Sequence, residues 1–130
     1  MIADTSVWLD YSADRPTWQA DRLATAIRER RAMIVDPVRL EVLAGLSPAA
    51  SPSRVNAMFD VCEDVLQLHR VDADDAAEIY RVCRTFGNTV RSLNDCLIAA
   101  IAIRNDVPVL HRDRDYAAMA RHFPLRVETE

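Results

Sequence analysis

Residues 93–110 read LNDCLIAAIAIRNDVPVL and carry the strongest structural signal in the chain. Apart from Asn94 and Asp95, the run up to Arg104 is apolar, which predicts a buried helix over residues 93–104. The apolar residues 107–110 then predict a short buried strand. A buried helix followed by a buried strand is typical of a sheet that is covered by helices.

The same alternation continues toward both ends of the chain. Further strands are predicted over residues 1–3, 32–35, 66–71 and 125–127, and further helices over 16–30, 37–45, 53–65, 72–87 and 116–122. Prolines and serines predict a connecting loop over residues 46–53. Strands that alternate with helices predict an α/β fold whose parallel sheet is covered on both faces. The length of 130 residues predicts one domain, residues 1–130.

The composition excludes several classes of protein. Half of the residues are hydrophobic and 28% are charged, so the chain can build a core and is not disordered. No apolar run approaches the ~20 residues that span a bilayer, and residues 1–11 do not resemble a signal peptide, so we expect a cytoplasmic protein without a membrane partner. The net charge of −4 argues against a protein that coats nucleic acid, although not against an enzyme that cuts it. The absence of lysine and of a glycine-rich loop excludes a P-loop ATPase.

Cysteine and histidine form no recognisable site for a soft metal. The cysteines are odd in number, show no CxxC spacing and lie in apolar segments, so we expect reduced, buried side chains at Cys62, Cys83 and Cys96. The three histidines are far apart in the sequence. His111 adjoins the acidic fourth motif described below, and we expect it to have a packing or hydrogen-bonding role, with contact to the substrate as the alternative.

Four acidic residues lie where the ligand site of a parallel sheet is expected, beyond the carboxyl ends of its strands. They are Asp4 after the first strand, Glu41 on the helix after the second, Asp95 at the start of the buried helix and Asp113 after the strand over 107–110. Each alone has an ordinary interpretation as a turn residue, a solvated helix residue, a residue that stabilises a helix start or a loop acid. Together they predict a cation site, because converging carboxylates cannot all stay ionised without a counter-charge. Oxygen ligands select Mg²⁺ or Mn²⁺.

Four motifs, in order, resemble those of PIN-domain proteins. They are Ile2-Ala-Asp-Thr-Ser-Val-Trp8, Glu41-Val-Leu-Ala-Gly45, Thr89–Ala100 and His111-Arg-Asp-Arg-Asp-Tyr116. Their order and spacing, over essentially the whole chain, resemble the VapC toxins of bacterial VapBC toxin–antitoxin pairs. The resemblance implies a three-layer α/β/α fold with a central, mainly parallel sheet of four to five short strands. It also implies a metal-dependent endoribonuclease.

The resemblance gives each acid a position in a catalytic site. The family's acidic positions fall on Asp4, Glu41, Asp95 and Asp113. In our assignment Asp4, Asp95 and Asp113 hold Mg²⁺, for which Mn²⁺ can substitute, and Glu41 orients the attacking water directly or through a second ion. Thr5 or Ser6 falls where the family hydrogen-bonds the first carboxylate. Asp115 matches a further acid of some members.

Substrate and partners are also expected from the resemblance. Arg91, Arg112 and Arg114 flank the third and fourth motifs, where guanidinium groups suit phosphate contacts, although charge balance with the acids is the alternative. The resemblance points to tRNA or rRNA as the class of substrate, and to a homodimer that binds a VapB-type antitoxin. Trp18, Met58 and Phe59 are candidate interface residues, with a role in the core as the alternative.

Two other functions remain open from the sequence. A receiver-like phosphoacceptor domain also gathers acids at strand ends and binds Mg²⁺, but it normally uses a lysine that this chain lacks. A catalytically silent PIN domain that binds RNA is the second alternative, and the intact acidic set argues against it. RNA cleavage that requires Mg²⁺ and stops in EDTA would exclude both.

Overall fold

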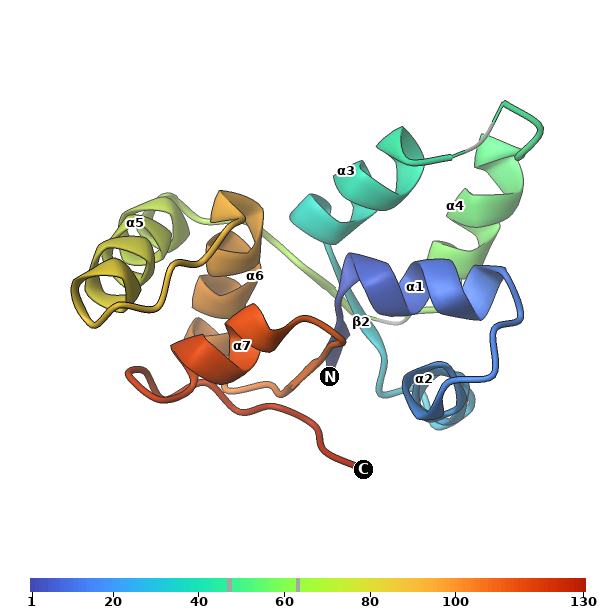
Figure 1. Cartoon of the computed structure of the whole chain (residues 1–130). Coiled ribbons are helices and arrows are strands. Elements are labelled where there is room, and N and C mark those ends of the chain that lie inside the picture. Colours follow the sequence, from blue (N-terminus) through green and yellow to red (C-terminus); the bar gives the residue numbers. More distant parts are fainter. Residues whose placement is uncertain (47, 63) are drawn as a thin grey trace.

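The structure is a computed structural model that describes residues 1–46, 48–62 and 64–130. These residues form four strands and seven helices (Figure 1). The strands are β1 (Ile2–Ala3), β2 (Met33–Val35), β3 (Asp64–Leu66) and β4 (Val109–Leu110). The helices are α1 (Thr5–Ser12), α2 (Trp18–Arg28), α3 (Asp36–Ala44), α4 (Pro52–Asp60), α5 (Arg70–Thr85), α6 (Leu93–Arg104) and α7 (Arg114–Met119).

The strands form one parallel sheet in the order β3-β2-β1-β4. Ile2 of β1 lies between Met33 of β2 and Val109 of β4. Figure 1 shows α5, α6 and α7 on one side of the sheet and α1, α2, α3 and α4 on the other. The predicted α/β class with a mainly parallel sheet is therefore confirmed. Because all strands run in one direction, their carboxyl ends share one edge, and α1 and α3 begin there.

Helix α6 forms the centre of the core. It is apolar on all sides, and its residues from Cys96 to Ala102 are buried except for Leu97, as expected for a helix with no polar face. Its last residue, Arg104, donates to both carboxylate oxygens of Asp72 at the start of α5, at 2.6 and 2.9 Å. This ion pair joins α6 to α5 at the end of α6 that lies away from Asp95.

Several predicted boundaries differ from the structure. Helix α1 was not predicted, because residues 4–6 look like a polar turn, whereas Asp4 is the N-cap of a helix. The predicted strand over 66–71 is wrong: β3 ends at Leu66, and the Asp72 carboxylate accepts the His69 N–H (2.7 Å), so a helix begins at Arg70. The predicted strand over 125–127 is reduced to a single bridge between Val127 and Val109.

Two helices are shorter than predicted or displaced. The helix predicted over 53–65 spans Pro52–Asp60, and that over 116–122 begins at Arg114 because Asp113 caps it. Residue 63 of the first segment, and residue 47 of the loop over 46–53, lie outside the described residues. No described helix is long and apolar enough to cross a membrane.

The side chains proposed for an interface divide into two groups. Phe59 is buried, and its ring packs edge-on against Trp8 with 5.1 Å between ring centroids, so its assignment to an interface is wrong. Trp18 and Met58 are only partly buried against the core. The three cysteines are buried and unpaired, as predicted.

Candidate functional site

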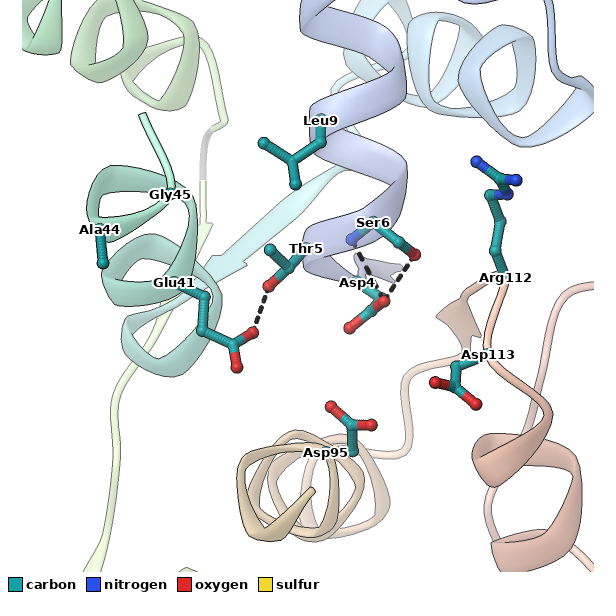
Figure 2. Close-up of a pocket in the computed structure, with 10 residues that line it drawn as sticks. All are labelled: Asp4, Thr5, Ser6, Leu9, Glu41, Ala44, Gly45, Asp95, Arg112 and Asp113. Carbon is teal, nitrogen blue, oxygen red and sulfur yellow. Dashed lines mark hydrogen bonds between the residues drawn. The ribbon is translucent and has the colours of Figure 1, made fainter. Parts of the chain in front are cut away.

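An open cavity of about 760 Å³ lies at the carboxyl edge of the sheet (Figure 2). It is lined by Asp4, Thr5, Ser6, Leu9, Glu41, Ala44, Gly45, Asp95, Arg112 and Asp113. The backbone N–H of Asp4 donates to the Leu110 carbonyl at 2.9 Å, so the residues that follow β1 and β4 are neighbours. The structure thus brings all four predicted acids into one cavity.

Asp4 is fixed by hydrogen bonds at both carboxylate oxygens. Oδ2 accepts from the Ser6 hydroxyl at 2.7 Å and from the Ser6 N–H at 3.3 Å, and Oδ1 accepts from the Tyr116 hydroxyl at 3.0 Å. Burial of Tyr116 and the neighbouring Asp4 charge raise the pKa of the Tyr116 hydroxyl well above its usual value, so it stays a neutral donor. Ser6 or Thr5 was predicted for this role from the sequence, whereas Tyr116 was not. The position of Tyr116 at the end of the fourth motif was the only signal for it.

Glu41 is oriented by the residue next to Asp4. The Thr5 hydroxyl donates to Glu41 Oε2 at 2.5 Å and so joins the start of α1 to α3 (Figure 2). The Glu41 side chain is half-buried on the cavity wall, and it is therefore not an ordinary solvated helix residue.

Asp95 lies in the first turn of α6 and is 8% exposed. The Ser92 hydroxyl accepts its backbone N–H at 3.2 Å and caps the helix. Burial and the nearby Asp4 carboxylate raise the pKa of Asp95 to about 7, with further contributions from Glu41 and Asp113. The cluster therefore carries negative charge that the protein itself does not neutralise.

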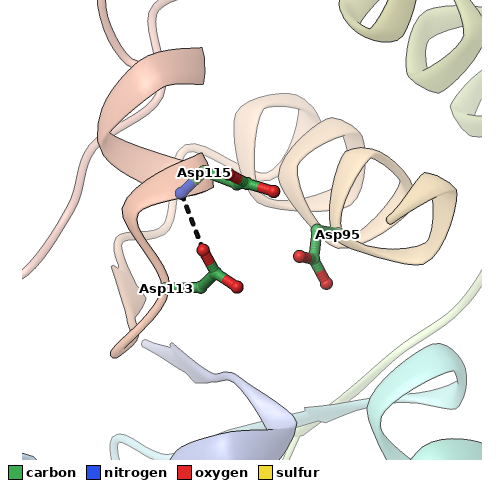
Figure 3. A group of neighbouring side chains, drawn as sticks. All are labelled: Asp95, Asp113 and Asp115. Atoms are coloured by element: carbon green, nitrogen blue, oxygen red, sulfur yellow. Dashed lines mark hydrogen bonds between the residues drawn. The ribbon is translucent and has the colours of Figure 1, made fainter. Parts of the chain in front are cut away.

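Asp115 joins the cluster from the start of α7. Oxygen atoms of Asp95, Asp113 and Asp115 all lie within 4.8 Å of one another (Figure 3). Asp113 caps α7 by accepting the Asp115 N–H at 3.0 Å, and Asp115 accepts the Arg91 N–H at 2.9 Å. The Arg91 guanidinium lies 3.0 Å from Asp113 and 3.6 Å from Asp115, so it offsets part of the charge.

Arg112 reaches the cavity from the loop after β4. It forms an ion pair with Asp10 of α1, which also pairs with Arg15 at 3.2 Å. Asp10 was not predicted, because nothing in the sequence shows that an acid of α1 is buried. His111 packs its ring against Tyr116 at 5.0 Å between centroids, and burial lowers its pKa, which agrees with the predicted packing role.

The donor atoms fit a hard divalent cation. Carboxylate and hydroxyl oxygens line the cavity, and no cysteine or histidine is among its described lining residues. Oxygen ligands of this kind favour Mg²⁺ or Mn²⁺ over zinc.

The α/β/α fold of this chain is shared with known proteins. The PIN domain family model matches residues 1–122. A VapC ribonuclease of Mycobacterium bovis and ribonuclease VapC11 of Mycobacterium tuberculosis are each 33% identical over 123 residues, covering 93% of this chain and 92% of theirs. The chain belongs to the VapC ribonuclease family of PIN-domain proteins.

Solved structures agree on the fold. VapBC2 from Rickettsia felis bound to a promoter DNA fragment has a TM-score of 0.73 at 16% identity and covers 98% of this chain and 96% of that chain. DNA-bound VapBC from Salmonella typhimurium has a TM-score of 0.73 at 20% identity, covering 98% and 95%. At these identities the similarity concerns the fold alone.

Proposed function

We propose that the protein is a Mg²⁺-dependent endoribonuclease and the toxin of a type II toxin–antitoxin pair. The observation that carries the proposal is the convergence of four carboxylates in one open cavity, one of them with a raised pKa. The curated relatives are named ribonucleases, which supports RNA as the substrate. Family membership argues against the receiver-like alternative.

The residues of the cavity have different roles in the proposed reaction. Asp4, Asp95 and Asp113 would hold the cation, and Glu41 would orient the attacking water. A bound Mg²⁺, or Mn²⁺ in its place, would supply an activated water and stabilise charge on the phosphate oxygens. Ser6 and Tyr116 keep Asp4 in one orientation, and Thr5 does the same for Glu41. Such supporting hydrogen bonds matter because metal sites depend on the orientation of their ligands.

Arg112 and Arg91 would contact the phosphates of the substrate. Their side chains are 44% and 61% exposed, so each guanidinium keeps donors free for solvent or phosphate while it is paired with an acid. These two residues offset the repulsion that an acidic cavity exerts on RNA.

We also propose a cytoplasmic homodimer that acts on tRNA or rRNA and binds a VapB-type antitoxin. The solved neighbours are VapBC complexes, which supports an antitoxin as partner. The partly buried Trp18 and Met58 remain candidates for an interface. A strictly monomeric mass at micromolar concentration without antitoxin would contradict the dimer.

The test is incubation of purified protein with total RNA in Mg²⁺, in Mn²⁺ and in excess EDTA, with Asp95→Asn as the inactive control. We expect discrete RNA cuts with either cation and none in EDTA, and mapping of the ends identifies the substrate. Cleavage that continues in EDTA would reject the metal mechanism. RNA binding without cleavage in any cation would favour the catalytically silent alternative.

A further inference from the structure

A second cavity, of about 390 Å³, lies between α7 and the loop that joins α5 to α6. The loop contributes Gly87, Asn88 and Thr89, and the helix side contributes Arg114, Ala118 and Arg121. We propose that this cavity and the neighbouring Phe86 bind a phosphate and a base of the single-stranded RNA segment next to the cleaved bond. The inference rests on the proposed ribonuclease function and extends its substrate site.

The second cavity adjoins the acidic site through a shared residue. Asp115 lines this cavity, and its carboxylate also belongs to the cluster with Asp95 and Asp113. An RNA strand whose scissile phosphate lies at the cluster must continue across a neighbouring surface. The second cavity is in a position to receive the next part of that strand.

The charges of the second cavity suit a phosphate group. Arg114 and Arg121 are both exposed, and neither forms an ion pair with any residue that the structure describes. Arg91 and Arg112, in contrast, are engaged by acids of the first site or of α1. Two arginines without acidic partners beside one cavity provide the donors that phosphate oxygens accept.

An aromatic surface stands next to these arginines. Phe86 is 66% exposed, and one face of its ring stacks on His122 at 4.7 Å between centroids with an angle of 16°. His122 is in turn within hydrogen-bonding distance of the Asn88 side chain, 3.0 Å from Nε2 to Nδ2. Phe86 is therefore supported from one side, although it lies outside the hydrophobic core.

The course of the chain places the arginines of the second cavity close to the Phe86 ring. Gly87 has a φ of +78°, a conformation that other residues rarely adopt, and the chain turns here between Phe86 and Asn88. Phe86 precedes a residue of the cavity wall, and its stacking partner His122 follows Arg121 directly. Proteins bind single-stranded nucleic acids with this combination, because guanidinium groups contact the phosphates and an aromatic ring stacks on a base.

The inference is tested by RNA binding in excess EDTA, where the proposed cleavage does not occur. The probe is a fluorescein-labelled single-stranded oligoribonucleotide about 12 nucleotides long, with binding followed by anisotropy across a salt titration. We expect the double variant Arg114→Ala/Arg121→Ala to bind at least about tenfold more weakly, with a salt slope smaller by about 1. Phe86→Ala should bind about fivefold more weakly, as expected for the loss of one stacked base.

Matched controls replace exposed residues elsewhere. Arg70→Ala removes one positive charge, half of what the double variant loses, at the far end of α5, and Leu68→Ala removes an exposed apolar side chain; neither should change binding. A second readout uses cleavage, where the double variant should raise KM for long RNA and leave a dinucleotide substrate unaffected. A structural defect in the double variant would instead impair the cleavage of both substrates and lower the melting temperature of the protein.

The outcomes separate this inference from the proposed function. If the double variant binds with wild-type affinity and salt slope, the subsite is wrong even when the protein cleaves RNA. If the wild type binds no RNA, the subsite is also wrong. If binding falls as expected but no cation supports cleavage, the cavity binds RNA as proposed, whereas the ribonuclease proposal and the position of the cavity next to a cleaved bond both fail.

Discussion

Asp10 of α1 and Arg112 of the loop after β4 form an ion pair between residues 102 positions apart in the chain. Asp10 is 1% exposed, whereas Arg112 is 44% exposed and reaches the acidic cavity. A buried carboxylate thus holds an arginine at the rim of the site. Because Asp10 is fixed within the core, it limits the positions that the Arg112 guanidinium can take.

Asp10→Asn should therefore weaken substrate binding more than it weakens catalysis. Without the charge of Asp10, Arg112 keeps its own charge but loses its fixed position, and we expect KM for RNA to rise about fivefold. The free energy of unfolding should fall by only about 1 kcal/mol, because both arginine partners can return to water. Steady-state kinetics and a urea melt measure the two effects. Arg15→Ala is the control: it removes the other partner and should leave KM unchanged.

Tyr116→Phe should reduce cation affinity without removing a ligand. The substitution deletes the hydroxyl that donates to Asp4 at 3.0 Å and leaves the buried ring in place. We expect about tenfold weaker Mg²⁺ affinity, on the scale of losing a supporting hydrogen bond, and a loss of about 1 kcal/mol in stability. Cation affinity is read from the Mg²⁺ dependence of cleavage and of the melting temperature. Tyr11→Phe tests the specificity of the effect, and an equal loss in that variant would show a general response to hydroxyl removal.

Thr5→Val tests the orientation of Glu41. Valine has nearly the same shape as threonine but cannot donate to Glu41 Oε2. We expect kcat to fall about tenfold while KM changes little, as for a group that acts on the positioned water. Thr25→Val is the matched control, because the Thr25 hydroxyl donates to the Asp21 carbonyl on the surface of α2. A normal kcat for Thr5→Val would show that this hydrogen bond does not support the reaction.

The sequence was most informative where one segment alone determines the structure. The bounds of α6 are those predicted, 93–104, because a helix that is apolar on all sides can only be buried. Asp4 and Asp113 could be identified because they follow strands that end at one edge, and Asp95 because it is a charged residue at the start of a buried helix. Helix α1 was missed, since its start depends on Asp4 acting as a cap for the residues that follow.

The features of the site and core that could not be predicted depend on contacts between segments that are far apart in the sequence. The Asp10–Arg112 and Tyr116–Asp4 contacts join positions more than a hundred residues apart, and each involves a side chain that would be equally suitable at an exposed position. Phe59 shows the same limit: its type fits an interface or a core, and only its packing against Trp8 decides between them.

Without metal, the free energy of unfolding should depend on pH, because the carboxylates of the cluster repel one another when they are ionised. Asp95 has a pKa of about 7 in the folded protein, whereas an unfolded chain gives about 3.9. Between these values the folded state binds more protons, so stability without metal should fall as pH rises from about 4 to about 7. Chemical melts in EDTA across this range measure the fall. A stability that rises steadily over the same interval would contradict the raised pKa.

Asp95→Asn should abolish both the loss of stability with rising pH and the cleavage activity. Asparagine has nearly the same shape but never ionises, so in EDTA near pH 8 the variant should be more stable by up to about 4 kcal/mol, the free energy that corresponds to raising a carboxyl pKa from about 3.9 to about 7, and its melting temperature should rise by about ten degrees. At about pH 3.5, where Asp95 is largely protonated in both the folded and the unfolded wild type, the two proteins should melt alike. Added Mg²⁺ should raise the melting temperature of the wild type more, because the cation binds only the folded state and prefers the ionised ligand. Cleavage should fall at least about 100-fold, on the scale of removing one preorganised electrostatic group. Asp74→Asn, at an exposed position of α5, is the control for loss of charge alone. If Asp95→Asn is inactive but much less stable in EDTA at both pH values, Asp95 is chiefly a structural residue of the α6 start.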